Sequence, residues 1–290
     1  MCWTRCCARS TVEREGRALN LLVINWQDRL NPQAGGAEIH LHEIFGRLAR
    51  RGHRVVLLAS GGEGASAREM VDGLEVHRTG GRLSFGLAAP CYYRRHLRAE
   101  AFDVVVEDLN KVPLFTPYWV RQPLALLVHH LFGRTAFEEA SVPIAAATWL
   151  LERPLARVYR GVPTVAVSRS TADDLVARGF EAGEIEVIPN GVDLAFYRPD
   201  PGEPRFPGPT LLYLGRLKRY KRVDLIIRAL AILRDRGVAA RLIVAGQGDH
   251  AGALEALVDE LELSDRVEFP GYVSERQKRR YFRGAWVHLL

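Results

Sequence analysis

Residues 19–60 read LNLLVINWQDRLNPQAGGAEIHLHEIFGRLARRGHRVVLLAS, and this stretch decides the fold. Two almost uniformly apolar runs, 19–25 and 54–60, enclose a segment with helical periodicity that ends at Gly52. The apolar face of that segment consists of Leu41, Ile44, Phe45 and Leu48. Strands this apolar leave no face for solvent, which is typical of a parallel sheet covered by helices on both sides. The stretch therefore predicts one β–α–β unit of a doubly wound α/β fold.

The same alternation continues along the chain and is interrupted once. Apolar runs follow at 102–107, 124–130, 163–168 and 185–189. Residues 199–209 then hold five of the fifteen prolines, and such a stretch favours stiff, extended backbone. We expect a poorly ordered leader over 1–18, a first domain over 19–198, a proline-rich linker over 199–209 and a second α/β domain over 210–290.

The composition is that of a globular protein, with 48% hydrophobic and 26% charged residues and no apolar run long enough to cross a bilayer. The leader lacks the apolar core of a secretory signal, so we expect a cytoplasmic protein. Its three cysteines have no second pair or histidine cluster, which argues against a metal site. The net charge of +6 suits a phosphate-rich ligand or an anionic membrane, whereas no nucleic-acid-binding motif is present.

A concentrated positive charge follows the first apolar run of the second domain. Between Arg216 and Arg222 the chain holds five basic residues and no acidic one. Parallel sheets bind ligands beyond the carboxyl ends of their strands, where helix N-termini favour anions. The pattern predicts a diphosphate site in which Arg216 offers a bidentate fork and Lys221 a point charge. A solvated basic turn is the alternative.

A glycine pair occupies the corresponding place in the first domain. Gly35 and Gly36 directly precede the helical segment, so a ligand can approach the backbone without meeting a Cβ atom. The pair fits neither a dinucleotide fingerprint nor a P-loop. A simple glycine turn is the alternative.

Five motifs in this order, GGAE, VAVSRST, VIPNGVD, LGRLKRYKRVDLII and LIVAGQGD, resemble those of the retaining GT-B glycosyltransferases of group 1 and family 4. The resemblance implies two Rossmann-like domains, a nucleotide-diphosphate-sugar donor held mainly by the second, and an acceptor held mainly by the first. It implies that Arg216 and Lys221 bind the leaving diphosphate, that Gly36 lies near the phosphate or sugar, and that His129 reaches the donor sugar. No metal or other cofactor is expected.

The resemblance also implies roles for other residues. His130 is the alternative to His129, and both His130 and Glu38 are candidates for the acceptor side. Glu107 and Asp108 are further acceptor-side candidates, although they depart from the family, in which many relatives have histidines after this strand. Gly271 and Val273 are expected near the nucleotide base. His40 and His42, two apart on a helix, are interpreted as surface or capping residues. The basic stretch YYRRHLR at 92–98 is either a solvated helix face or a contact with an anionic membrane or a lipid phosphate.

One expected segment is missing. The family's two glutamates, seven residues apart in a glycine-containing segment, should follow the apolar run AWVHLL that ends the chain. Glu260 and Glu268 do not match, because no glycine-rich loop joins them. We therefore expect a C-terminally truncated glycosyltransferase whose second domain is incomplete. The alternatives are a nucleotide-sugar epimerase or phosphorylase on the same scaffold, and a non-catalytic nucleotide-binding subunit.

Overall fold

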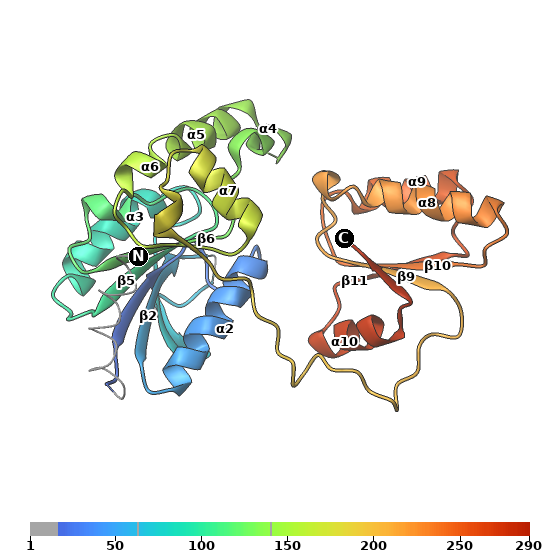
Figure 1. The fold of residues 1–290 in the computed structure, drawn as a ribbon, viewed down its shortest axis with the longest axis horizontal. Coiled ribbons are helices and arrows are strands. Elements are labelled where there is room, and N and C mark those ends of the chain that lie inside the picture. The colour runs from blue at the N-terminus through green and yellow to red at the C-terminus, as the bar shows by residue number, and fades with distance from the viewer. Residues whose placement is uncertain (1–16, 63, 140) are drawn as a thin grey trace. The chain divides into compact units, whose positions relative to one another are not determined.

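The computed structural model describes residues 17–62, 64–139 and 141–290, without the side chains of residues 134, 138 and 139. Most of the predicted leader lies outside the described residues. The chain divides into two compact units, Met1–Gly191 and Val192–Leu290 (Figure 1). Each unit is a sheet covered by helices, as the alternation of apolar runs and helical segments predicts.

The first unit contains an eight-stranded sheet in the order β3-β4-β2-β1-β5-β6-β7-β8. Its strands are β1 (Asn20–Ile24), β2 (Arg54–Ser60), β3 (Arg68–Val71), β4 (Leu74–Thr79), β5 (Val104–Leu109), β6 (Leu124–Val128), β7 (Thr164–Ala166) and β8 (Ile185–Val187). All neighbours pair in parallel except β3, which runs antiparallel to β4 at the edge. The predicted parallel sheet is confirmed. The β3–β4 pair was not predicted, because its residues are too polar to form an apolar run.

Helices cover both faces of this sheet. The helix α2 (Gly36–Arg50) packs on the face that carries Leu21 and Val23. The helix α3 (Phe85–Tyr92) and the π-helical turn Tyr93–Leu97 pack on the opposite face, against Leu22 and Ile24. The remaining helices are α4 (Ala136–Glu139), α5 (Val142–Glu152), α6 (Leu155–Val158) and α7 (Arg169–Ala177). Alternate residues of β1 therefore belong to different cores, which is why the strand is apolar throughout.

The second unit contains four parallel strands in the order β11-β10-β9-β12. The strands are β9 (Thr210–Leu214), β10 (Arg241–Ala245), β11 (Val267–Gly271) and β12 (Val287–Leu289). The helices α8 (Val223–Asp235) and α9 (Ala251–Glu260) cover one face, and α10 (Glu275–Gly284) packs on the other (Figure 1).

The division between the units falls before the predicted proline-rich linker. Residues 192–209 group with the second unit because α10 holds them. Arg283 of α10 donates to the carbonyl oxygen of Arg198 at 2.9 Å and pairs with Asp200 and Glu203. Among the described residues, no helix is long and apolar enough to span a membrane. The cytoplasmic location stays a prediction.

Candidate functional site

The basic stretch lies between β9 and α8, at the carboxyl end of the strand. Two of its cations are neutralised: Lys218 lies 2.6 Å from Asp249, and Arg222 lies 3.1 Å from Asp224. Arg216 and Lys221 are exposed, and no carboxylate of a described residue lies within 4.0 Å of either side chain. The two cations predicted to bind a diphosphate are therefore available to a ligand.

A second loop holds the Arg216 loop in place. The backbone N–H groups of Gly215 and Leu217 donate to the carbonyl oxygens of Ala245 and Gln247 at 3.0 and 2.9 Å. The Tyr213 hydroxyl donates to the carbonyl oxygen of Arg216 at 2.9 Å. These bonds fix the backbone that carries Arg216 and leave its guanidinium in solvent.

The approach of the two loops requires glycine in the second. A Cβ atom on Gly246 would lie 1.8 Å from the carbonyl oxygen of Gly215, and one on Gly248 would lie 2.1 Å from that of Leu217. Gly246 also has a φ of +143°. The motif LIVAGQGD carries part of the family resemblance, but this packing role was not predicted from it, although two glycines separated by one residue after a buried strand signal a close backbone approach.

In the first unit, the glycine pair begins α2. Gly35 is the N-cap residue with extended backbone (φ −139°), and a Cβ atom on Gly36 would meet nothing within 4 Å. Position 36 therefore does not need glycine for a left-handed φ or to avoid a clash with the rest of the protein. The glycine leaves open space at a helix N-terminus, as a site for an approaching anion requires.

Glu38 ties this helix start to the loop after β5. Its buried carboxylate accepts from the backbone N–H of Gly35 at 2.6 Å, from Asn110 Nδ2 at 2.7 Å and from Lys111 Nζ at 3.2 Å. Burial acts to raise the pKa of Glu38, but Lys111 and the backbone donors outweigh burial and lower it. Glu38 is thus an ionised residue that positions its neighbours.

Asp108 and His129 meet at the ends of β5 and β6. His129 Nε2 lies 2.8 Å from Asp108 Oδ1, close enough for an ion pair but without the direction of a hydrogen bond. The His40 ring packs edge-on against His129 with a centroid distance of 5.1 Å. Burial raises the pKa of Asp108 despite His129, and burial together with His129 lowers the pKa of His40 to about 4.

This edge of the first sheet gathers buried polar atoms that lack a hydrogen-bond partner within the described structure. They are Asn25 Oδ1, His40 Nδ1, Asp108 Oδ1, Asn110 Oδ1 and His129 Nε2. Buried polar groups are rarely left without partners, so this cluster needs a specific explanation, and a bound polar ligand is one. Together with Gly36, these atoms form a candidate site of the first unit.

The structure separates other predicted residues from this cluster. Glu107 points to the opposite face of the sheet from Asp108, where its buried carboxylate accepts from Leu114, Thr116 and Tyr159, so we no longer assign it to the acceptor side. His130 is exposed, whereas His129 is buried in the cluster. This difference favours His129 of the two candidates.

The residues expected near the base lie at the end of β11. Gly271 has a φ of +71° and accepts the N–H of Gly246 at 2.8 Å, so it adjoins the glycine loop. The side chain of Val273 is buried with Leu212 and Ile243. Only the backbone of Val273 is therefore open to a ligand.

The interpretation of His40 and His42 as surface residues was wrong. His42 is buried and lies 3.0 Å from Asp72, and the half-buried His40 belongs to the polar cluster. No local pattern signals this burial, because the partners come from distant parts of the chain: Asp72 from the end of β3 and His129 from the end of β6.

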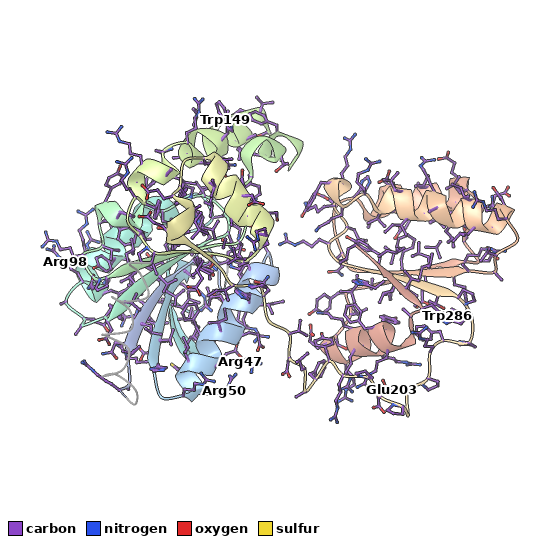
Figure 2. The ribbon with its side chains drawn as sticks, viewed as in Figure 1. Arg47, Arg50, Arg98, Trp149, Glu203 and Trp286 are labelled. Carbon is purple, nitrogen blue, oxygen red and sulfur yellow. The ribbon has the colours of Figure 1, made fainter. Side chains whose placement is uncertain are left out.

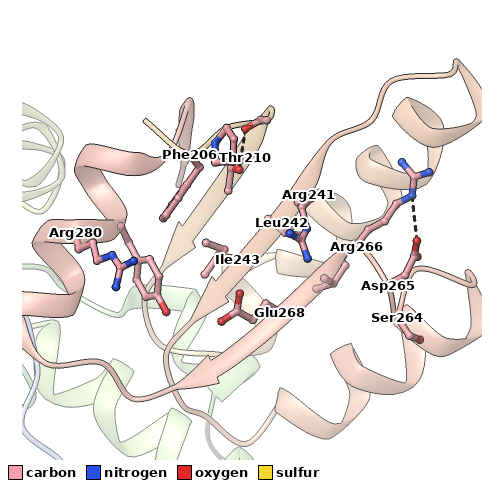
Figure 3. Close-up of a pocket in the computed structure, with 14 residues that line it drawn as sticks. Phe206, Thr210, Arg241, Leu242, Ile243, Ser264, Asp265, Arg266, Glu268 and Arg280 are labelled. Carbon is pink, nitrogen blue, oxygen red and sulfur yellow. Dashed lines mark hydrogen bonds and ion pairs between the residues drawn. The ribbon is translucent and has the colours of Figure 1, made fainter. Parts of the chain in front are cut away.

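A hollow of about 560 Å³ in the second unit lies away from the candidate site (Figure 3). Its lining includes Thr210, Arg241 and Val267, the residues at which β9, β10 and β11 begin. Arg216 follows the opposite, carboxyl end of β9. Because ligands of parallel sheets bind beyond the carboxyl ends of the strands, we do not assign the hollow to the site.

Two sheets of parallel strands, the first with one antiparallel edge strand, carry charged or unpartnered polar groups at their carboxyl edges, and together they define a Rossmann-like ligand-binding protein. Residues 34–196 match the model of Glycosyltransferase Family 4, and residues 202–290 match the model of Glycosyl transferases group 1. The chain therefore belongs to the glycosyltransferases of family 4 and group 1.

Individual relatives are more distant. A phosphatidylinositol N-acetylglucosaminyltransferase subunit from Arabidopsis thaliana is 26% identical over 273 residues, which cover 89% of this chain and 59% of the relative. The D-inositol 3-phosphate glycosyltransferase of Kineococcus radiotolerans is 28% identical over 292 residues, covering 88% of this chain and 67% of the relative. This chain thus spans less than two thirds of the Arabidopsis relative.

The crystal structure of Anabaena HepE in complex with UDP and glucose matches with a TM-score of 0.67 at 18% identity, covering 93% of this chain and 73% of that chain. At this identity the likeness concerns the fold, which is the GT-B fold with two Rossmann-like domains.

Proposed function

We propose that this chain takes part in transferring a sugar from a nucleotide-diphosphate sugar to an acceptor hydroxyl, with retention of the anomeric configuration. The observation that carries the proposal is the pair of exposed cations, Arg216 and Lys221, without a carboxylate partner among the described residues, at a strand–helix junction. Family membership and the UDP in the HepE complex support the same assignment.

In the proposed reaction, the bond between the anomeric carbon and the phosphate oxygen breaks while a bond to the acceptor oxygen forms. Negative charge develops on the leaving diphosphate, and Arg216 and Lys221 stabilise it. The diphosphate takes the acceptor's proton on the same face of the sugar, so no protein nucleophile and no metal is required. The rate then depends on positioning and on electrostatic stabilisation.

The unpartnered atoms of the first unit suit sugar and acceptor hydroxyls. The oxygens Asn25 Oδ1 and Asn110 Oδ1 have no hydrogen-bond partner in the described structure and can accept from hydroxyl groups, while Asp108 Oδ1 faces His129. We assign His129 to the transferred sugar and Asp108 to the acceptor, and Gly36 to the backbone that approaches the phosphate or sugar. Gly271 and the backbone of Val273 are assigned to the base.

The test is a calorimetric titration of UDP, GDP and ADP into the purified chain and into the variants Arg216→Ala and Lys221→Ala. Hydrogen bonds to charged groups contribute about 1.5–3 kcal/mol, so each variant should bind its preferred nucleotide roughly 10- to 100-fold more weakly. The matched control is Arg222→Ala, which removes the same charge from a guanidinium already paired with Asp224. It should retain affinity within about two-fold.

Unchanged affinity in both test variants would refute the diphosphate clamp, and an equal loss in the control would mean that only the net charge matters. Turnover distinguishes the remaining alternatives. Acceptor-free conversion of a nucleotide sugar would indicate an epimerase, which the family match does not favour. Saturable binding without turnover would indicate a non-catalytic subunit; the Arabidopsis relative is itself named as one subunit of its enzyme.

A further inference from the structure

The hollow of about 560 Å³ in the second unit lies on the face of the sheet that α10 covers (Figure 3). Side chains alternate along β10 and β11, and Leu242 and Val267 belong to the core under α8 and α9. Arg241, Ile243 and Glu268 therefore project from the opposite face, towards α10. Ile243 and Glu268 are neighbours in the register of the two strands, so an apolar side chain and a carboxylate share the floor of the hollow.

The wall of the hollow at Phe206 is fixed by hydrogen bonds and by packing. The N–H of Phe206 donates to the carbonyl oxygen of Gly284 at 2.8 Å, and its carbonyl oxygen accepts from Nε1 of Trp286 at 2.9 Å (Figure 2). A Cβ atom on Gly284 would lie 2.6 Å from the Phe206 ring, so the ring packs directly on the backbone of α10. The Tyr281 ring, with a centroid 6.5 Å from that of Phe206, forms the neighbouring wall. The hollow is therefore preformed.

Two arginines of the hollow have no ion-pair partner. A third, Arg266, lies 3.9 Å from Asp265 and donates to the carbonyl oxygen of Val238 at 3.3 Å. By contrast, no carboxylate of the residues that the structure describes lies within 4.0 Å of the Arg241 or Arg280 side chain. Both of these side chains are exposed, so their charges are available to a ligand in the hollow.

Glu268 lies between these two arginines in the view of Figure 3 but pairs with neither. Within the described part of the chain, no basic group lies within 4.0 Å of its carboxylate. Burial and, after it, the negative charge of Glu268 raise the pKa of Tyr281, whereas Arg280 acts to lower it. The carboxylate, the phenol and the guanidinium therefore face one space. Opposite charges that share a hollow without pairing leave room for a ligand between them.

We propose that this hollow binds a phosphorylated sugar, at a site separate from Arg216. The two arginines supply the cations that a phosphate group requires. An ionised Glu268 only accepts hydrogen bonds, so it suits sugar hydroxyls, and the rings of Phe206 and Tyr281 offer apolar surface to the carbon skeleton. The volume of about 560 Å³ is typical of a small-ligand site. The hollow adjoins the amino ends of β9, β10 and β11, whereas Arg216 follows the carboxyl end of β9, so the two sites lie at opposite edges of the sheet.

The charge balance distinguishes a sugar phosphate from an amino acid. An ammonium group would also bind the carboxylate of Glu268. The lining, however, holds three arginines, Arg241, Arg266 and Arg280, against two carboxylates, Asp265 and Glu268. This excess of positive charge repels an ammonium group, whereas it does not repel neutral hydroxyl groups.

The experiment is calorimetric titration of the purified chain with glucose 1-phosphate, glucose 6-phosphate and mannose 6-phosphate, without nucleotide. Inorganic phosphate and free glucose are titrated for comparison. We expect at least one hexose phosphate to bind more tightly than either, because only a hexose phosphate contacts both the arginines and Glu268. Arg241→Gln and Arg280→Gln should each weaken this binding about 10-fold, because a hydrogen bond between charged groups is lost. The melting temperature should not change, since both side chains are exposed.

The matched control is Arg276→Gln, which removes the same charge from an exposed position of α10 outside the hollow. It should keep the affinity within about two-fold. Glu268→Gln separates sugar recognition from simple attraction of an anion. It should lower the preference for the hexose phosphate over inorganic phosphate about 10-fold, because the sugar hydroxyls lose a charged acceptor while phosphate loses only a repelling charge. Arg216→Ala should leave hexose-phosphate binding unchanged.

The proposal is overturned if no hexose phosphate binds, if inorganic phosphate binds as tightly as all three hexose phosphates, or if Arg276→Gln loses as much affinity as Arg241→Gln. Loss of binding in Arg216→Ala would also overturn it, because the hexose phosphate would then occupy the candidate diphosphate site. Since the assay contains neither donor nor acceptor, each of these outcomes leaves the proposed transfer reaction to its own test.

Discussion

Replacement of Gly248 by alanine should displace the loop that carries Arg216. The new Cβ atom would lie 2.1 Å from the carbonyl oxygen of Leu217 and 2.5 Å from its carbonyl carbon, both backbone atoms that cannot rotate away. Ordinary contact begins at 3.4 Å, so the two loops must separate by roughly 1 Å. The hydrogen bond from the N–H of Leu217 to Gln247, now 2.9 Å, would lengthen or break.

The expected cost to stability is about 1–3 kcal/mol, because overpacking at a close contact is relieved by backbone movement. Chemical denaturation of the purified chain measures it. Nucleotide affinity should also fall, at least about 10-fold, since a displaced Arg216 can no longer bind the diphosphate together with Lys221.

The matched control is Gly252→Ala, four residues further along in α9, where a Cβ atom would meet nothing within 4 Å. Alanine has the better helix propensity, so this variant should be as stable as the unmodified chain or up to about 1 kcal/mol more stable, with unchanged nucleotide affinity. If Gly248→Ala keeps both stability and nucleotide affinity, the argument that the two loops position Arg216 is wrong.

Three further predictions concern the first unit. Glu152→Ala should destabilise it by about 2–4 kcal/mol in urea unfolding, because the buried carboxylate accepts from the N–H groups of Phe132 and Gly133 and pairs with Arg178; a change below about 0.5 kcal/mol would contradict this. Gly36→Ala should preserve stability but weaken donor binding, which comparing melting temperature with nucleotide-sugar titration checks; unaltered binding would exclude Gly36 from the site. Burial lowers the pKa of His40 from 6.5 to about 4, so below pH 6.5 the unfolded chain binds a proton that the folded chain does not, and the folded state loses stability as the pH falls towards 4. Relative to His40→Gln, the unmodified chain should lose about 1–2 kcal/mol of unfolding free energy over this range; equal losses would refute it.

Local sequence was sufficient for the features that depend on neighbours along the chain. The apolar runs at 19–25 and 54–60 predicted parallel strands because both faces of such strands are buried. The charge run from Arg216 to Arg222 predicted a cationic strand–helix junction, because the run directly follows an apolar strand and precedes a helical segment in the sequence. Alternation along β5 also places Glu107 and Asp108 on opposite sides of the sheet, so the misassignment of Glu107 to the acceptor side was avoidable from the sequence.

Tertiary structure decided which charges remain available. Asp249 neutralises Lys218 from 31 positions further along the chain, so composition could not distinguish Lys218 from Lys221. The gathering of Asn25, Asp108 and His129 likewise depends on β1, β5 and β6 ending at one edge of a sheet, although they are far apart in sequence. The sequence by itself determined the elements and the kind of charge each loop carries, because periodicity and charge are local properties. Only the fold decided which polar groups meet, which are neutralised and which remain open to a ligand, because those outcomes depend on distances between residues that the chain order does not contain.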